Sequence, residues 1–182
     1  MSTTASILIV DDETHVGAAL RRSLGWALGP GVAIDTCLDP RVAVERVRAR
    51  DYAVVMADLR MPGMDGVEFL TAVARLRPLS VRLMLTASAD FASAQLAINE
   101  AGVFRYLCKP WEDDALIDHV RAALDESRRV RELADHAQAW EDEVRTPTPE
   151  ELERRRLEAL EPGITKVHWG PNGEVVLTTP LA

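Results

Sequence analysis

Apolar runs of strand length alternate with amphipathic stretches along the first two-thirds of the chain. Five runs are continuous enough to be strands buried on both faces: Ser6–Val10, Val32–Cys37, Ala53–Ala57, Val81–Leu85 and Val103–Cys108. Helices are expected between and after them, at Glu13–Leu28, Pro40–Arg50, Gly66–Leu76, Phe91–Glu100 and from about Glu112 onward. This alternation predicts an α/β fold, a doubly wound parallel sheet with right-handed crossovers and helices on both faces.

The last of these helices continues past the length that packing on a sheet requires. Ile117, Val120 and Leu124 form the stripe expected to face the sheet. Apolar positions then follow at alternating three- and four-residue steps: Val130, Leu133, Ala137, Trp140 and Val144. This spacing is typical of a short coiled-coil seam, so residues 128–146 are predicted to be a helical extension that pairs two copies of the chain. The alternative is an amphipathic helix that folds back on its own domain.

The C-terminal segment is predicted to be a small helix-hairpin appendage. After a Pro-rich linker, Glu150–Leu160 reads as a helix whose acidic first turn suits the helix dipole. Two short strand candidates follow, joined by an Asn-Gly pair that favours a hairpin turn: Ile164–Gly170 and Glu174–Thr178. Because an isolated hairpin is marginally stable, it is expected to pack on the helix or on another chain.

Composition narrows the class of protein. The chain has 182 residues, of which 47% are hydrophobic, enough for one ordinary globular domain and an appendage. Its formal net charge of −8 argues against a dominant surface for nucleic acid or anionic membrane. No apolar stretch is long enough for a membrane span, and the N-terminus lacks the basic segment of a signal peptide. Cys37 and Cys108 lie in apolar runs and are expected to be reduced and buried, as in a cytoplasmic protein.

Acidic side chains follow two of the predicted strands. Asp11 and Asp12 come directly after the first strand, and Asp58 follows the third. Ligands bind beyond the carboxyl ends of the strands in open α/β sheets, so these carboxylates converge if the two strands are neighbours. Close carboxylates ionise together only with a compensating cation, and a hard divalent ion such as Mg²⁺ is the natural partner. The sequence therefore predicts an acidic metal pocket.

A hydroxyl and an ammonium group complete the predicted pocket. Thr86 ends the fourth strand, and Lys109 ends the fifth. Together these groups suit a phosphoryl group: the metal and the lysine neutralise its oxygens, the hydroxyl donates a hydrogen bond, and one carboxylate is free to attack.

Taken together, these segments resemble the receiver domain of a bacterial two-component response regulator. The matching segments stand in the family's order: Ile7–Glu13, Met56–Gly66, Leu85–Ser88 and Tyr106–Pro110. The resemblance implies a CheY-like (flavodoxin-like) sheet of strand order 2-1-3-4-5. The receiver is thus expected over residues 1–127, and the patterns described above place the extension at 128–146 and the appendage at 147–182.

The resemblance assigns a role to each strand-end residue. Asp58 is implied as the phosphoacceptor, which takes a phosphoryl group from a sensor histidine kinase or a phosphotransfer protein. Asp12 is implied as a direct ligand of Mg²⁺ (Mn²⁺ also fits), Asp11 as a partner through metal-bound water, and the backbone carbonyl of Arg60 as a further ligand. Lys109 is implied to pair with the phosphoryl oxygens.

The resemblance further implies a conformational switch beside the pocket. Thr86 would bond a phosphoryl oxygen and Tyr106 would change rotamer with it, while Pro110 would follow a cis peptide bond. The aspartates, the lysine and the tyrosine of the predicted site could also have purely structural roles. The aspartates suit turns and caps, the lysine suits a surface position, and the tyrosine suits a strand core.

Three functions compete at this point. The preferred one is a signalling module that phosphorylation controls and that acts by protein–protein contact, without turnover of external metabolites. A DNA-binding transcription regulator requires a basic recognition helix, but Arg154–Arg156 stands among glutamates and reads as a solvated helix face. A phosphatase of the haloacid-dehalogenase type requires a second aspartate two residues after the nucleophile, where this chain has Arg60. The four histidines show no metal-ligand spacing.

Overall fold

The computed structural model describes residues 5–87, 101–144, 148–160, 168–169 and 175–176. The chain divides into two compact units, Met1–His136 and Ala137–Ala182, and each is described by itself. The predicted helix Phe91–Glu100 lies outside the described residues.

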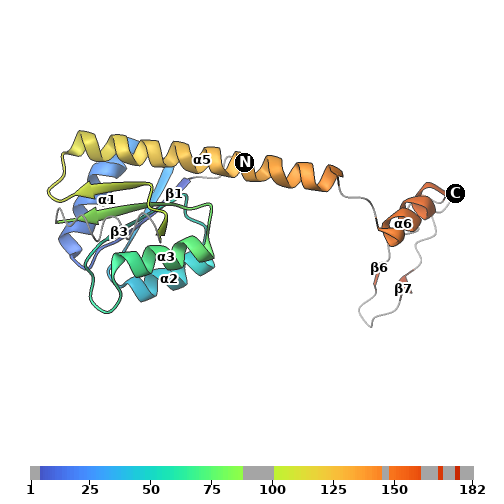
Figure 1. Ribbon diagram of the computed structural model, residues 1–182, viewed down its shortest axis with the longest axis horizontal. Coiled ribbons are helices and arrows are strands. Elements are labelled where there is room, and N and C mark those ends of the chain that lie inside the picture. The colour runs from blue at the N-terminus through green and yellow to red at the C-terminus, as the bar shows by residue number, and fades with distance from the viewer. Residues whose placement is uncertain (1–4, 88–100, 145–147, 161–167, 170–174, 177–182) are drawn as a thin grey trace. The chain divides into compact units, whose positions relative to one another are not determined.

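A five-stranded parallel sheet forms the centre of the first unit (Figure 1). Its strands are β1 (Ala5–Val10), β2 (Val32–Cys37), β3 (Val54–Asp58), β4 (Val81–Thr86) and β5 (Arg105–Cys108). Their order, β2-β1-β3-β4-β5, confirms the predicted topology. In the register of the sheet Asp58 pairs with Leu85, and Thr86 pairs with Cys108, so β3, β4 and β5 end at the same edge.

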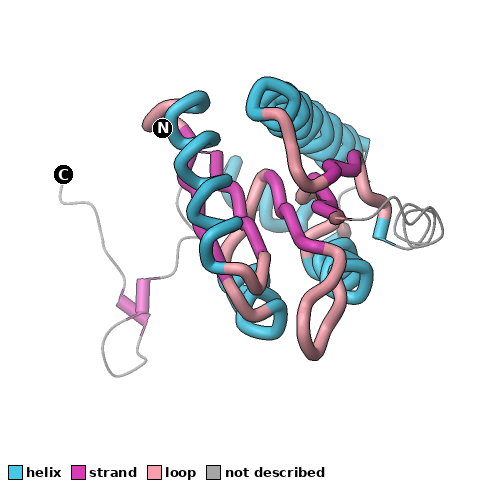
Figure 2. The backbone as a smooth tube through the Cα atoms, turned by 90° about the vertical axis from the view of Figure 1, so that its left-hand side faces the viewer, coloured by secondary structure: helices cyan, strands magenta, loops and turns pink. Residues whose placement is uncertain are grey.

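Helices cover both faces of this sheet (Figure 2). They are α1 (Thr14–Leu28), α2 (Pro40–Ala49), α3 (Gly66–Leu76) and α5 (Asp113–Val144). Leu20 and Leu24 of α1 share one buried cluster with Leu116 and Val120 of α5, whereas α2 and α3 pack into a second cluster on the opposite face. The apolar runs are continuous because each strand is buried between these two layers.

Local capping sets where the helices begin. The side chain of Asp39 accepts a hydrogen bond of 2.8 Å from the backbone N–H of Arg41 and acts as the N-cap of α2. Asp65 and Glu68 form a reciprocal capping box at the start of α3. The start of α3 at Gly66, which lies close to Asp58, is therefore set by residues next to it in the sequence.

Two expectations for β5 were wrong. The strand begins at Arg105 rather than at Val103, after a turn in which Gly102 has a φ of 55°. Cys108 is exposed, whereas Cys37 is buried as predicted, and both are free thiols. β5 lies at the edge of the sheet and Cys108 is its last residue, so an apolar sequence context does not place its side chain in the core.

The second unit contains the end of α5, the helix α6 (Pro149–Leu160) and the paired strands β6 (His168–Trp169) and β7 (Val175–Val176). Thr148 and Glu151 cap the start of α6 reciprocally, at 2.9 and 3.2 Å. β6 and β7 pair antiparallel, as predicted for a hairpin, and the residues of its turn lie outside the described part. None of the helices in the described ranges is long and apolar enough to cross a membrane.

Candidate functional site

A buried lysine joins two carboxylates at the carboxyl edge of the sheet. The Nζ atom of Lys109 lies 2.5 Å from Oδ1 of Asp58 and 2.7 Å from Oδ2 of Asp11. The side chain of Asp11 is only 1% exposed, and that of Lys109 is 13% exposed. The structure thus brings together three of the residues that the sequence predicted for the pocket.

Strand ends position all three groups. Asp58 is the last residue of β3, and the N–H of the next residue, Leu59, donates to the carbonyl of Leu85 at 2.8 Å. Asp11 follows β1 directly and donates its N–H to Cys37 at 3.1 Å. Lys109 follows β5 and donates its N–H to the carbonyl of Thr86 at 2.7 Å. Because sheet hydrogen bonding continues to each residue, the backbone of the site is held as rigidly as the sheet.

The two carboxylates are further oriented by backbone donors. The N–H of Arg60 donates to Oδ2 of Asp58 at 2.7 Å, and the N–H of Glu13 donates to Oδ1 of Asp11 at 2.9 Å. One oxygen of each carboxylate therefore faces Lys109 while the other is held by the chain. Charge-assisted bonds of this kind fix the direction of a carboxylate strongly.

Burial and ion pairing have opposite effects on the pKa values of Asp11 and Lys109. Burial raises the pKa of Asp11, although the hydrogen bonds from Lys109 and Glu13 act in the opposite direction. Burial works against the charge of Lys109, but its hydrogen bonds with Asp11 and Asp58 raise the pKa of the ammonium group above its ordinary value. Lys109 is therefore a permanent cation at neutral pH, and it compensates part of the negative charge of the two carboxylates.

The remaining predicted residues lie around this centre. Asp12 is exposed beside Asp11, and Thr86 is buried at the end of β4. Tyr106 is half-buried and packs on the same cluster as Met84, which is its register partner on β4. Since side chains two positions apart share a strand face, Thr86 and Tyr106 lie on the same face of neighbouring strands.

The geometry decides one of two expectations about the backbone. The peptide bond between Lys109 and Pro110 is cis, as predicted. At Arg60 the structure shows the N–H at the Asp58 carboxylate, while a metal-ligand role of the Arg60 carbonyl stays a prediction.

Two contributors were not singled out from the sequence. A carboxylate oxygen of Glu13 lies 3.9 Å from Nζ of Lys109 and adds a third negative charge near the lysine. Gly66 donates its N–H to Leu59 at 2.9 Å, and a Cβ atom at this position would lie 2.2 Å from the carbonyl oxygen of Asp58. The position of Glu13 directly after the aspartate pair was the available signal for the first, whereas Gly66 needed the structure.

Comparison with known proteins identifies the family. Residues 7–121 match the response regulator receiver domain. The chain belongs to this family. The chain is 35% identical over 145 residues to the hydrogenase transcriptional regulatory protein HoxA of Cupriavidus necator, a match that covers 80% of this chain and 28% of HoxA. The chain thus spans less than a third of the length of this relative.

Solved structures give the same assignment. The receiver domain of an HD domain-containing protein from Pseudomonas fluorescens Pf-5 is similar with a TM-score of 0.68 and 28% identity, over 72% of this chain and 95% of that one. The chemotaxis protein CheY4 of Vibrio cholerae is similar with a TM-score of 0.61 and 27% identity, over 67% of this chain and all of that one (100%).

Proposed function

We propose that this receiver accepts a phosphoryl group on Asp58 from a phosphohistidine of a sensor kinase or a phosphotransfer protein in the cytoplasm. The observation that carries the proposal is the buried contact of Lys109 with both Asp58 and Asp11. An oxygen of Asp58 forms the new bond to phosphorus as the bond from phosphorus to the donor nitrogen breaks, and the donor nitrogen keeps that electron pair. Lys109 then neutralises an oxygen of the transferred group.

The residues of the site fit a hard divalent cation that keeps most of its waters. Among the described residues there is no group of three or more His, Cys, Asp or Glu side chains close enough to form a full metal cage. However, Asp11 and Asp58 offer converging carboxylates, with exposed Asp12 and the Arg60 carbonyl as the further expected ligands. Such a sparse oxygen donor set suits Mg²⁺, with Mn²⁺ as a substitute. The ion supplies charge neutralisation for the incoming phosphoryl group.

The direct test is the mass of the intact protein after incubation with acetyl phosphate and Mg²⁺. We expect a gain of one phosphoryl group in the parent and no gain in Asp58→Asn or after chelation of the metal. Asp39→Asn is a matched control, because Asn also caps a helix and Asp39 lies in the α2 cap. Undiminished labelling of Asp58→Asn would refute the assignment.

Thr86 and Tyr106 are the pair through which this modification would act. Thr86 is buried at the strand end beside Lys109, and Tyr106 is half-buried on the same face. A new bond from the Thr86 hydroxyl to the phosphoryl group would bias the position of Tyr106. The receiver is then a switch that modifies itself, and it turns over no external metabolite.

For the output we propose protein–protein contact, including homodimerisation through the seam of α5. Leu133 and Trp140 are exposed, and α6 has no buried residue among those described. Pairing with a second copy would cover the seam in a symmetric contact. We expect light scattering to give a dimer for the full chain and a monomer for Trp140→Gln. Trp26→Gln is the matched control, because Trp26 is exposed on α1. A monomeric parent would contradict the proposal.

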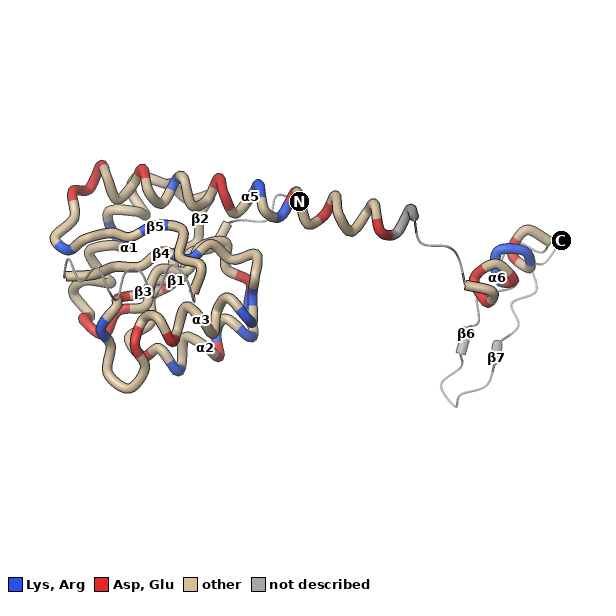
Figure 3. Tube along the Cα trace, in the orientation of Figure 1, with Lys and Arg blue, Asp and Glu red and all other residues tan. Residues whose placement is uncertain are grey.

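The names of the relatives favour transcription control as a second candidate for the output. HoxA is named a hydrogenase transcriptional regulatory protein, and NtrC of Escherichia coli, 30% identical over 118 residues, is named a DNA-binding transcriptional regulator. The match covers only 28% and 24% of these proteins. In this chain the arginines of α6 stand among acidic residues (Figure 3), and Arg156 lies 3.8 Å from Glu153. DNA retention that is lost in an Arg154→Gln, Arg155→Gln variant would favour this candidate over protein contact.

A further inference from the structure

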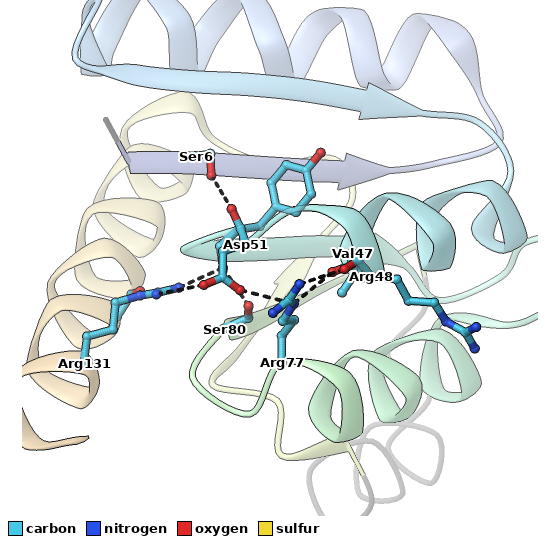
Figure 4. A network of polar contacts seen from close by, with 9 residues as sticks. Ser6, Val47, Arg48, Asp51, Arg77, Ser80 and Arg131 are labelled. Carbon is cyan, nitrogen blue, oxygen red and sulfur yellow. Dashed lines mark hydrogen bonds and ion pairs between the residues drawn. The ribbon is translucent and has the colours of Figure 1, made fainter. Parts of the chain in front are cut away.

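A second cluster of charges lies at the amino edge of the sheet. The carboxylate of Asp51, just before β3, contacts two arginines from different elements (Figure 4). Nε of Arg77 lies 3.2 Å from Oδ1 of Asp51, and Nη1 of Arg131 lies 3.4 Å from Oδ2. Arg77 is the C-cap of α3, and Arg131 belongs to α5. Asp51 therefore joins the end of α3 to the last helix of the receiver.

The backbone of Asp51 and Tyr52 is tied to the neighbouring strands. The hydroxyl of Ser6, in β1, donates to the carbonyl of Asp51 at 3.0 Å, and the hydroxyl of Ser80, just before β4, donates to that of Tyr52 at 2.6 Å. Arg131 also donates to the carbonyl of Tyr52, at 3.4 Å. The segment that leads into β3 is thus held by β1, β4 and α5 together, as Figure 4 shows for the side chains involved.

Two rigid elements connect this cluster to the phosphoacceptor. β3 runs from just after Tyr52 to Asp58 and is buried throughout. α3 begins at Gly66, whose N–H donates to Leu59 and which leaves no room for a Cβ beside the Asp58 carbonyl. The helix then ends next to Arg77, which donates to the carbonyls of Val47 at 3.0 Å and Arg48 at 2.7 Å as well. Both β3 and α3 therefore extend from the neighbourhood of Asp58 toward Asp51.

We propose that the Asp51 cluster is a regulatory junction. It holds the turn of α5 around Arg131 on the amino edge of the sheet. When phosphorylation of Asp58 displaces β3 and α3, the cluster transmits this displacement to that turn. The route is separate from Thr86 and Tyr106, which lie at the carboxyl edge. This inference rests on the proposed function, because the displacement requires modification of Asp58.

Hydrogen exchange of the backbone amides of residues 127–136 in the full chain tests the junction. In the unmodified protein we expect Asp51→Asn and Arg131→Gln to speed exchange in this segment by about twofold to fivefold, the range for a partly exposed ion pair. The matched controls are Asp125→Asn and Arg129→Gln. These residues pair within α5, Asp125 with Arg128 and Arg129 with Glu126, and do not contact Asp51. Circular dichroism checks that every variant is folded.

The same measurement is repeated with acetyl phosphate and Mg²⁺, while the intact mass reports phosphorylation. We expect exchange of residues 127–136 to change in the parent and in both controls, and to change no further in Asp51→Asn and Arg131→Gln. A Thr86→Ala variant that is phosphorylated should keep the change. If the mass rises and the segment does not respond, or if the response survives in Arg131→Gln, the junction is refuted although Asp58 is the acceptor. If the mass does not rise, Asp58 is not phosphorylated, and both the proposed function and the proposed transmission to α5 are refuted.

Discussion

Lys109 pairs with two carboxylates at one end of the parallel sheet, and Arg131 pairs with one at the other end, but the two sites differ in their exposure to water. At the carboxyl edge the lysine is 13% exposed and Asp11 is 1% exposed. At the amino edge Arg131 is 35% exposed and Asp51 is 56% exposed. Water screens the second pair and hardly reaches the first. The charges at the carboxyl edge therefore interact strongly and depend on one another, whereas those at the amino edge interact weakly.

The largest difference between the two edges is expected when the cation is removed. Lys109→Met leaves Asp11 and Asp58 buried without their common partner, so the free energy of unfolding should fall by about 3 kcal/mol. Arg131→Met should cost less than about 1 kcal/mol, because its partner Asp51 faces water. Urea denaturation of both variants measures the two losses.

A second substitution shows whether the loss comes from charge. In the Asp58→Asn background Lys109→Met should cost about half as much, since only Asp11 remains buried and charged. The distinction between the edges would be refuted if Lys109→Met and Arg131→Met lowered the unfolding free energy equally. It would also be refuted if Asp58→Asn did not reduce the effect of Lys109→Met.

Glycine substitutions should give the next largest effect. A Cβ atom at Gly66 would lie 2.2 Å from the Asp58 carbonyl oxygen, so Gly66→Ala must displace α3 or the end of β3. We expect a loss of about 2 kcal/mol in unfolding free energy and slower uptake of phosphate. Gly25→Ala, in α1, meets nothing within 4 Å and should instead gain up to about 1 kcal/mol from helix propensity. A Gly66→Ala variant as stable as the parent would show that the contact is not needed.

The two edges also differ in how far sequence reasoning could reach them. Asp11, Asp58 and Lys109 could be placed at one edge because each follows an apolar run that is buried on both faces. In a parallel sheet the carboxyl ends of such strands lie at the same edge. The start of α3 at Gly66 follows from a capping box that is local in sequence. These features need only short-range patterns and a parallel topology, so they could be predicted.

The amino edge could not be predicted in the same way. Asp51 and Arg131 are 80 positions apart, and no local pattern marks either as the partner of the other. Their contact depends on where α5 crosses the sheet, which is a property of packing. The exposure of Cys108 was missed for a similar reason, since an apolar run does not reveal that its strand lies at the sheet edge. Glu13 was visible in the motif, but its distance from Lys109 depends on the start of α1.

Alkaline pH should expose a smaller effect at the amino edge. Burial, and then the hydrogen bond of 3.0 Å to Asp35, raises the pKa of Tyr52 above its usual 10.0. The folded protein therefore keeps this proton to higher pH than the unfolded chain, so the free energy of unfolding falls as the pH rises from 10.0 through the folded pKa. Lys109 adds a similar fall above 10.5, because its folded pKa is also raised.

Tyr52→Phe should flatten the part of this fall that begins near 10.0 and leave the part due to Lys109. The measurement is urea unfolding from about pH 9 to about pH 11, read as a slope so that the loss of the Asp35 hydrogen bond cancels. Because the chain has only two tyrosines, absorbance of the phenolate gives an independent titration of the parent and the variant. An unchanged slope would mean that Tyr52 titrates alike in both states.

The smallest expected effect is the response to salt, and it separates the edges most directly. A double-mutant cycle of Asp51→Asn with Arg131→Gln should give a coupling of about 0.5 kcal/mol at low ionic strength. At about 1 M salt the screening length falls to roughly 3 Å, so this coupling should vanish. The cycle of Asp11→Asn with Lys109→Met should keep most of its coupling, because the 2.7 Å contact is buried and is therefore screened much less. If both couplings fell together, the carboxyl edge would be as open to solvent as the amino edge, and the difference in burial would not set the chemistry of the site.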